Sequence, residues 1–114
     1  MRTDERERSA YHHGDLPRVL LEKAIELLDE RGVEGFSLRE VARRAKVAAA
    51  APSHHFGNVS GLLTAVAIEG FRQLTAAFKT VLDQDLEPIE HVVGLCEAYI
   101  NHHRRYPGTG SIMF

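Results

Sequence analysis

Cysteine, tryptophan and long apolar runs are scarce or absent in this chain of 114 residues. The one cysteine, Cys96, excludes an internal disulfide framework and fits a reducing compartment. No apolar run approaches the roughly 18 residues that a membrane-spanning helix needs, and the polar, mixed-charge beginning is unlike a signal peptide. We therefore expect a cytoplasmic protein that makes no contact with a membrane.

An excess of positive charge is also missing, since the net charge is −2. Residues 1–57 contain ten basic and ten acidic side chains, whereas residues 58–114 contain four and six. A protein that binds nucleic acid needs a positive surface, so a chain with this balance has to gather its cations on one face. The charge balance alone therefore does not decide whether the chain binds nucleic acid.

Apolar residues recur at spacings of three and four along most of the chain, which predicts an all-α fold without a strand pattern or an internal repeat. The first helix is expected over residues 16–31, with Asp15 as its N-cap and Gly32 as its stop, after a flexible arm at residues 1–14. Four further helices are expected at residues 38–45, 49–55 and 59–84 and from Pro88 to just before Pro107. The apolar tail at residues 110–114 resembles the opening of a sixth helix.

The clearest local signal is a capping box at Ser37 and Glu40. In such a box the hydroxyl accepts the amide of the third helical residue, and the carboxylate returns to the amide of the cap. Phe36 and Val41 stand where a hydrophobic staple belongs. Asn58 is placed to cap the long helix that follows.

Two short helices with a tight break between them, packed on a longer first helix, form a helix-turn-helix between about residues 37 and 56. The second short helix would project from the body to enter a major groove about 12 Å wide. Ser37, at the beginning of the first short helix, is placed both to cap that helix and to donate a hydrogen bond to a phosphate.

Two segments of the chain resemble the N-terminal region of the TetR/AcrR family of transcriptional regulators: GDLPRVLLEKAIELLDERGVEGFSLREVARRAKV and APSHHFGNVSGLLTAVAIEGF. The resemblance covers about residues 16–71. It rests on several features at the family's spacing, which are Gly32, the Ser37 cap, Val41-Ala42, Val47, His55-Phe56 and Leu62-Leu63.

The resemblance implies a homodimeric repressor, or less often an activator, that binds a palindromic DNA operator and is released by a small effector. Residues 15–57 would form a three-helix DNA-binding unit, and residues 58–114 the first helices of an incomplete ligand-binding and dimerisation domain. The recognition helix would span residues 48–55, with Phe56 as core beneath it. The expected DNA-binding residues are Ser37, Arg39, Arg43, Lys46, Ala49, Ala50, Ser53, His54, His55 and Asn58. The arm residues Arg6, Arg8, Tyr11, His12 and His13 would reach phosphates or the minor groove.

The chain departs from the family pattern at four positions. Lys46 stands at the usual turn glycine, Ala48 at the usual serine cap, Ser53 at a tyrosine and Val59 at a basic residue. The last two normally supply phosphate contacts, so the departures predict weaker DNA binding. A helical interaction module of the same fold that has lost operator binding is therefore the alternative function.

Other classes of site have little support. Adjacent histidines on a helix point about 100° apart, so the pairs at residues 12–13, 54–55 and 102–103 predict no metal site. No phosphate loop, activated nucleophile or buried carboxylate pair indicates an enzyme, and no cofactor is expected. The apolar faces of the later helices lack partners, which predicts self-association. The side chains that would line an effector pocket, and that otherwise form core, are Phe71, Leu74, Phe78, Cys96 and Tyr99.

Overall fold

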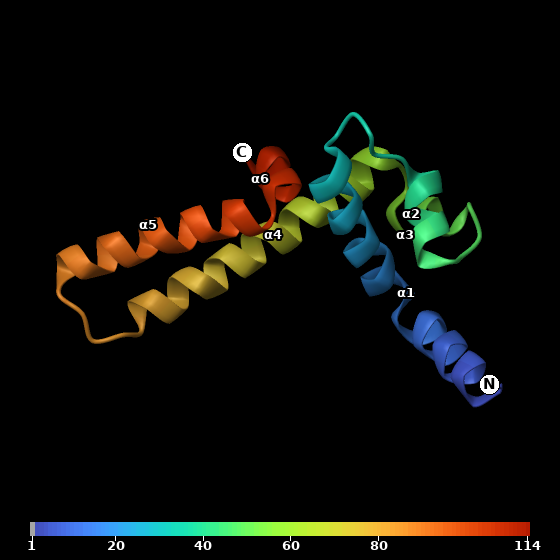
Figure 1. Cartoon of the computed structure of the whole chain (residues 1–114), viewed down its shortest axis with the longest axis horizontal. Helices are drawn as coiled ribbons and strands as arrows, with labels where there is room; N and C mark the ends of the chain where they lie inside the picture. The colour runs from blue at the N-terminus through green and yellow to red at the C-terminus, as the bar shows by residue number, and fades with distance from the viewer. Residues whose placement is uncertain (1) are drawn as a thin grey trace.

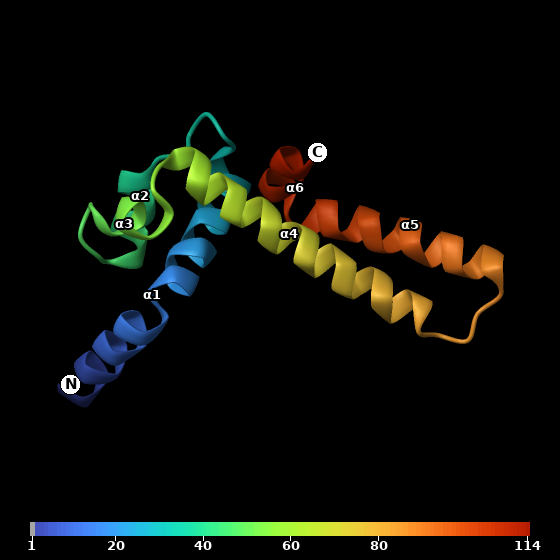
Figure 2. The same ribbon diagram turned by 180° about the vertical axis from the view of Figure 1, so that it is seen from behind.

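Six helices follow one another in the computed structural model, which describes the backbone of residues 2–114 and the side chains from residue 15 onward. They are α1 (Arg2–Arg31), α2 (Leu38–Ala45), α3 (Ala51–Phe56), α4 (Val59–Leu82), α5 (Pro88–Arg105) and α6 (Pro107–Met113). Helices α2 and α3 lie at one end, and α4 and α5 run side by side away from them (Figures 1 and 2). These residues contain no strand, which confirms the all-α fold class.

Helix α1 begins at Arg2 rather than near residue 16, so the helix is longer than expected, while the flexibility of residues 1–14 stays a prediction. The backbone at Asp15 is not helical, with φ −129° and ψ 24°, and the helix has a kink there. The part after the kink therefore begins where the N-cap was predicted. Gly32 ends the helix with φ 75°, and its N–H donates to the carbonyl of Leu28 at 2.8 Å.

The core lies where α1, α2 and the beginning of α4 meet. The apolar residues that recur at spacings of three and four along α1 form one buried stripe, because Leu20, Ala24, Leu27 and Leu28 are all fully buried or nearly so and Leu16 packs against them partly buried. Buried side chains from the other two helices join the same cluster, namely Val41, Ala45, Leu62 and Val66. Helix α4 therefore belongs both to this core and to the long α4–α5 hairpin.

The predicted bounds of the two short helices hold for α2 but not for α3. Helix α3 begins at Ala51, two residues after the position expected, and Ala49 and Ala50 form a turn before it. Ala50 stands at the N-cap, where a methyl group cannot accept an amide hydrogen bond. Pro52 occupies the first turn, where its missing N–H costs little. Helix α4 ends at Leu82, two residues earlier than expected.

Helix α6 is held against the end of α1 by a contact that the sequence did not reveal. The Asp29 carboxylate accepts hydrogen bonds from the backbone N–H groups of Gly108 at 2.9 Å and Thr109 at 3.3 Å. A Cβ atom at Gly108 would lie 2.2 Å from the carbonyl oxygen of Leu28, so only glycine allows this approach. Burial raises the pKa of Asp29, although the two hydrogen bonds act in the opposite direction.

The predicted apolar face of α5 lies at the surface. Ile89 is 69% exposed, and Val92, Val93 and Ile100 are each about half exposed. The prediction of self-association through this face stays a prediction. Among the described residues, no helix combines the length and the apolar character that crossing a membrane requires.

The contact between Asp29 and α6 yields a test of the fold. Asp29→Ala should destabilise the protein by about 1–2 kcal/mol in urea unfolding, because it leaves two backbone N–H groups in a crowded interface without their acceptor. Glu26→Ala is the matched control, since this residue lies in the same helix and makes only an exposed ion pair with Lys23 at 3.4 Å. Equal stabilities of the two variants would contradict this account of how α6 is held.

Candidate nucleic-acid interface

The ten residues expected to bind DNA all lie at the surface. They belong to α2, α3 and the turns beside them, and we call this set the α2–α3 face: Ser37, Arg39, Arg43, Lys46, Ala49, Ala50, Ser53, His54, His55 and Asn58. The side chains of the arm residues Arg6, Arg8, Tyr11, His12 and His13 lie outside those that the structure describes.

Buried side chains beneath this face hold α2 and α3 in place. Val41, Ala42 and Ala45 are the buried residues of α2, and Pro52 is the buried residue of α3. Phe56, expected as core, is half-buried and packs against the same cluster. Ser53, His54 and His55 of α3 are exposed, as a helix that enters a groove requires.

The turn between the two helices depends on an unusual backbone at Lys46. This residue ends α2 in the left-handed region, with φ 59° and ψ 46°. Its N–H donates to the carbonyl of Arg43 at 3.1 Å, and the N–H of Val47 donates to the carbonyl of Ala42 at 3.1 Å. These bonds close the end of α2 in the way that a C-terminal glycine usually does, and they direct the chain toward α3.

The capping-box prediction is correct for Ser37 and wrong for Glu40. The Ser37 oxygen accepts from the N–H of Glu40 at 3.1 Å, so the cap is present. The Glu40 carboxylate, however, pairs with the guanidinium of Arg43, whose Nε lies 3.0 and 3.1 Å from its two oxygens. A charged partner within reach on the same helix binds this carboxylate more strongly than the backbone amide does.

A second arginine ties α2 to α1. The Arg44 Nη1 lies 2.7 Å from Glu30 in α1, and its Nε lies 3.3 Å from Glu40. Its side chain is only 16% exposed, so Arg44 is a structural cation. The two arginines together lower the pKa of Glu40 to about 2. Two of the four cations between residues 37 and 58 are thereby neutralised, while Arg39 and Lys46 form no ion pair in the part of the chain described here.

Helix α3 offers small and neutral groups rather than cations. No acidic residue, and no lysine or arginine, occurs between residues 48 and 58. The Ser53 hydroxyl donates to the carbonyl of Ala50 at 3.0 Å, which leaves its oxygen free to accept a further bond. The rings of His54 and His55 lie edge to face with centroids 5.3 Å apart. Asn58 caps α4 by accepting the N–H of Gly61 at 2.8 Å, as predicted.

The residues expected to line an effector pocket are only partly brought together. Phe78, Cys96 and Tyr99 line an apolar hollow of about 490 Å³ between α4 and α5. Leu74 is buried, and the centre of the Phe71 ring lies 5.3 Å from that of Phe114 instead.

Among the side chains described, no group of three or more histidine, cysteine or acidic residues is arranged to hold a metal ion.

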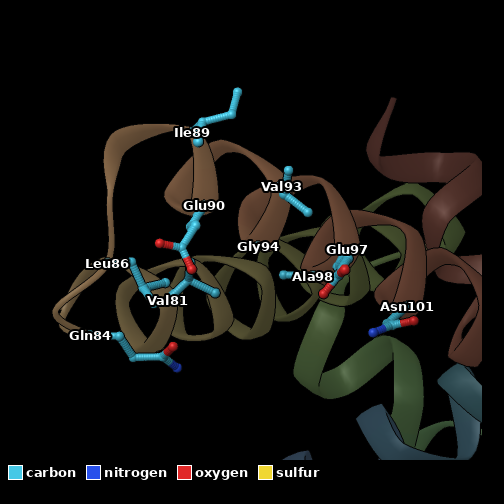
Figure 3. A pocket seen from close by; sticks show the side chains of 10 residues that line it. All are labelled: Val81, Gln84, Leu86, Ile89, Glu90, Val93, Gly94, Glu97, Ala98 and Asn101. Carbon is cyan, nitrogen blue, oxygen red and sulfur yellow. The ribbon is translucent and has the colours of Figure 1, made fainter.

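A second hollow, of about 480 Å³, lies at the far end of the α4–α5 hairpin and was not expected from the sequence. It is lined by Val81, Leu86 and Ile89 together with polar side chains that include Glu90 and Glu97 (Figure 3). The Glu90 carboxylate accepts the N–H of Glu87 at 3.2 Å, which gives it a structural role at the beginning of α5. The loop between α4 and α5, beside which this hollow lies, is at the opposite end of the α4–α5 hairpin from α2 and α3 (Figure 1).

The α2–α3 face lies within a segment that matches a known protein family. Residues 20–66 match the family model for bacterial regulatory proteins of the tetR family. The HTH-type transcriptional regulators BetI of Burkholderia thailandensis, Burkholderia ambifaria and Burkholderia mallei are each 38% identical to this chain over 58 residues. That stretch is 51% of this chain and 30% of theirs, so the match spans less than a third of these relatives.

A solved structure extends the similarity to most of the chain. A protein of unknown function from Rhodococcus sp. RHA1 superposes with a TM-score of 0.75 and 40% sequence identity. The match covers 90% of this chain and 54% of that one. The similarity therefore extends well beyond residues 20–66.

The pairing of Glu40 gives this site a pH dependence. The pKa of Glu40 lies below its ordinary value of 4.5 in the folded protein, so its ionised form stabilises the fold above pH 4.5. This stabilisation should be lost as the pH falls from 4.5 to about 2. Chemical unfolding at several pH values should show that Glu40→Gln lacks this part of the acid destabilisation.

Glu34→Gln is the matched control, because Glu34 is exposed and forms no ion pair among the described residues. It should lose stability between pH 4.5 and 2 just as the unaltered protein does. If Glu40→Gln loses as much unfolding free energy between pH 4.5 and 2 as the unaltered protein does, the contacts to Arg43 and Arg44 do not stabilise the folded state.

Proposed function

Residues 20–66 belong to the tetR family of bacterial regulatory proteins, and on this premise we propose that the chain binds double-stranded DNA through its α2–α3 face and regulates transcription. The observation that carries the proposal is the way α2 and α3 are held. Their buried residues fix them to α1, and all ten expected contact residues remain exposed. A helix presented in this manner fits a major groove.

The side chains of the α2–α3 face fall into two groups, one suited to phosphate contacts and the other to base contacts. Arg39, Lys46 and the Ser37 hydroxyl would contact phosphates, which position the protein without selecting a sequence. Ala49 and Ala50 present methyl groups, which suit the methyl group of thymine, whereas Ser53 and His54 offer the polar groups that can recognise base edges. With few cations on the face, we expect an affinity that is modest and depends strongly on the symmetry of a dimer.

We extend the proposal to a homodimeric repressor controlled by an apolar effector. The exposed apolar residues of α5 supply a surface that a second copy can bury. The hollow lined by Phe78, Cys96 and Tyr99 exposes almost no polar surface, which supports an apolar ligand. Helix α4 joins this hollow to the core beneath α2, so a ligand there would act on the DNA-binding end through one continuous helix.

One observation favours a helical interaction module instead. Glu40 neutralises Arg43 and helps to neutralise Arg44, so half of the cations of α2 and its turn are withdrawn from a phosphate backbone. A module that binds protein rather than DNA has no need of those cations. Titration with sheared DNA at two salt concentrations separates the two functions, because only the DNA-binding protein loses affinity steeply as the salt concentration rises.

A matched pair of variants tests where the DNA binds. Arg39→Ala should weaken binding to a fluorescent duplex and should make the slope of log K against log salt shallower by about 0.9, because one phosphate contact is lost. Arg104→Ala removes the same charge from an exposed position near the end of α5, and it should leave both the affinity and the slope unchanged. Equal losses in the two variants would place the DNA elsewhere on the molecule.

A further inference from the structure

We propose that Lys46 anchors a DNA phosphate beside the groove that α3 enters, and that the protein keeps an unfavourable backbone conformation at this residue for the sake of that contact. The inference rests on the DNA-binding function proposed above. It assigns the contact to one residue, and it states that the same residue strengthens DNA binding and lowers the stability of the fold.

The first step is the backbone. Lys46 has φ 59° and ψ 46°, and it is the only residue other than glycine with a positive φ in the described part of the chain. In this region the Cβ atom of an L-residue crowds the following carbonyl oxygen, which glycine avoids. Gly32 and Gly57, the other two residues with positive φ, both end helices without this cost.

The second step is the supply of cations. Residues 37–58 contain four lysine or arginine side chains, and two of them are already paired. Arg43 is held by Glu40 through both carboxylate oxygens, and Arg44 bridges Glu30 and Glu40. Helix α3 itself has neither lysine nor arginine. Of the described side chains at residues 37–58, Arg39 and Lys46 therefore supply the free positive charge near α3.

The third step is position. Lys46 caps the C-terminal end of α2, five residues before α3 begins at Ala51, and its side chain is exposed. A long, flexible ammonium side chain between the two helices can reach the backbone that borders the groove when α3 occupies it. The ammonium would also lie near the carbonyl groups that end α2, where a cation is favoured. Strain at an exposed residue of a candidate site is the pattern expected of a functional constraint.

Four variants separate the backbone cost from the charge. Lys46→Gly and Lys46→Asn remove the charge and tolerate the left-handed conformation, Lys46→Gln removes the charge and keeps the strain, and Lys46→Arg keeps both. The melting temperature should rise by about 3 °C in the glycine variant and less in the asparagine variant, and it should stay near that of the unaltered protein in the other two.

Binding should follow the charge instead of the backbone. In anisotropy titrations, the glycine, asparagine and glutamine variants should bind two duplexes of unrelated sequence about two- to fivefold more weakly, with a salt slope shallower by about 1. Lys46→Arg should retain the affinity. Because a phosphate contact ignores sequence, the loss should be the same on both duplexes.

The possible results distinguish this inference from the function on which it rests. If the unaltered protein fails to bind duplex DNA at any salt concentration, both fall. If it binds with a steep salt slope and Lys46→Gln matches it, only the inference about Lys46 falls. A glycine variant that gains stability without losing affinity would likewise overturn it.

Discussion

The packing of α2 onto α1 is the constraint on which the rest of the structure depends. Val41, which is fully buried, fills the space between the two helices together with Ala42 and Ala45. The small side chains let the helices approach closely, and a core packed this tightly cannot lose a methylene without cost. Because one side of α2 is committed to this contact, the opposite side and the turn that follows are turned outward.

Charge pairing refines the same arrangement. Arg44 joins α2 to α1 through Glu30, and Glu40 connects it to Arg43. These contacts hold the orientation of α2, but they also reduce the number of cations on the α2–α3 face. The face therefore combines a firm support with a sparse positive charge, which fits a protein whose affinity for DNA is set by a few contacts.

The sequence predicted the elements that follow from periodicity and capping. The stripe of Leu20, Leu27 and Leu28, the Ser37 cap and the Asn58 cap all agree with the structure, because each depends on residues three or four positions apart. The late beginning of α3 was not predicted. The family pattern places the cap of this helix at position 48, but the methyl group of Ala48 cannot accept the amide hydrogen bond that a cap requires.

Contacts between residues distant in sequence were the other part that could not be predicted. Nothing local to Asp29 indicates that it accepts the amides of Gly108 and Thr109, about 80 positions away. The pairing of Glu40 with Arg43 was open to prediction from their spacing, but the capping box competed for the same carboxylate. The left-handed backbone at Lys46 was open to prediction, because Lys46 stands where the family pattern has its turn glycine.

The central claim is that α2 and α3 together present one outward face to duplex DNA. Titrating isotopically labelled protein with a short duplex, and following the backbone amide signals by NMR, tests this claim most directly. The account predicts shifts concentrated between residues 37 and 58, with little change along α5. Shifts that follow α5 and leave α3 unchanged would contradict it.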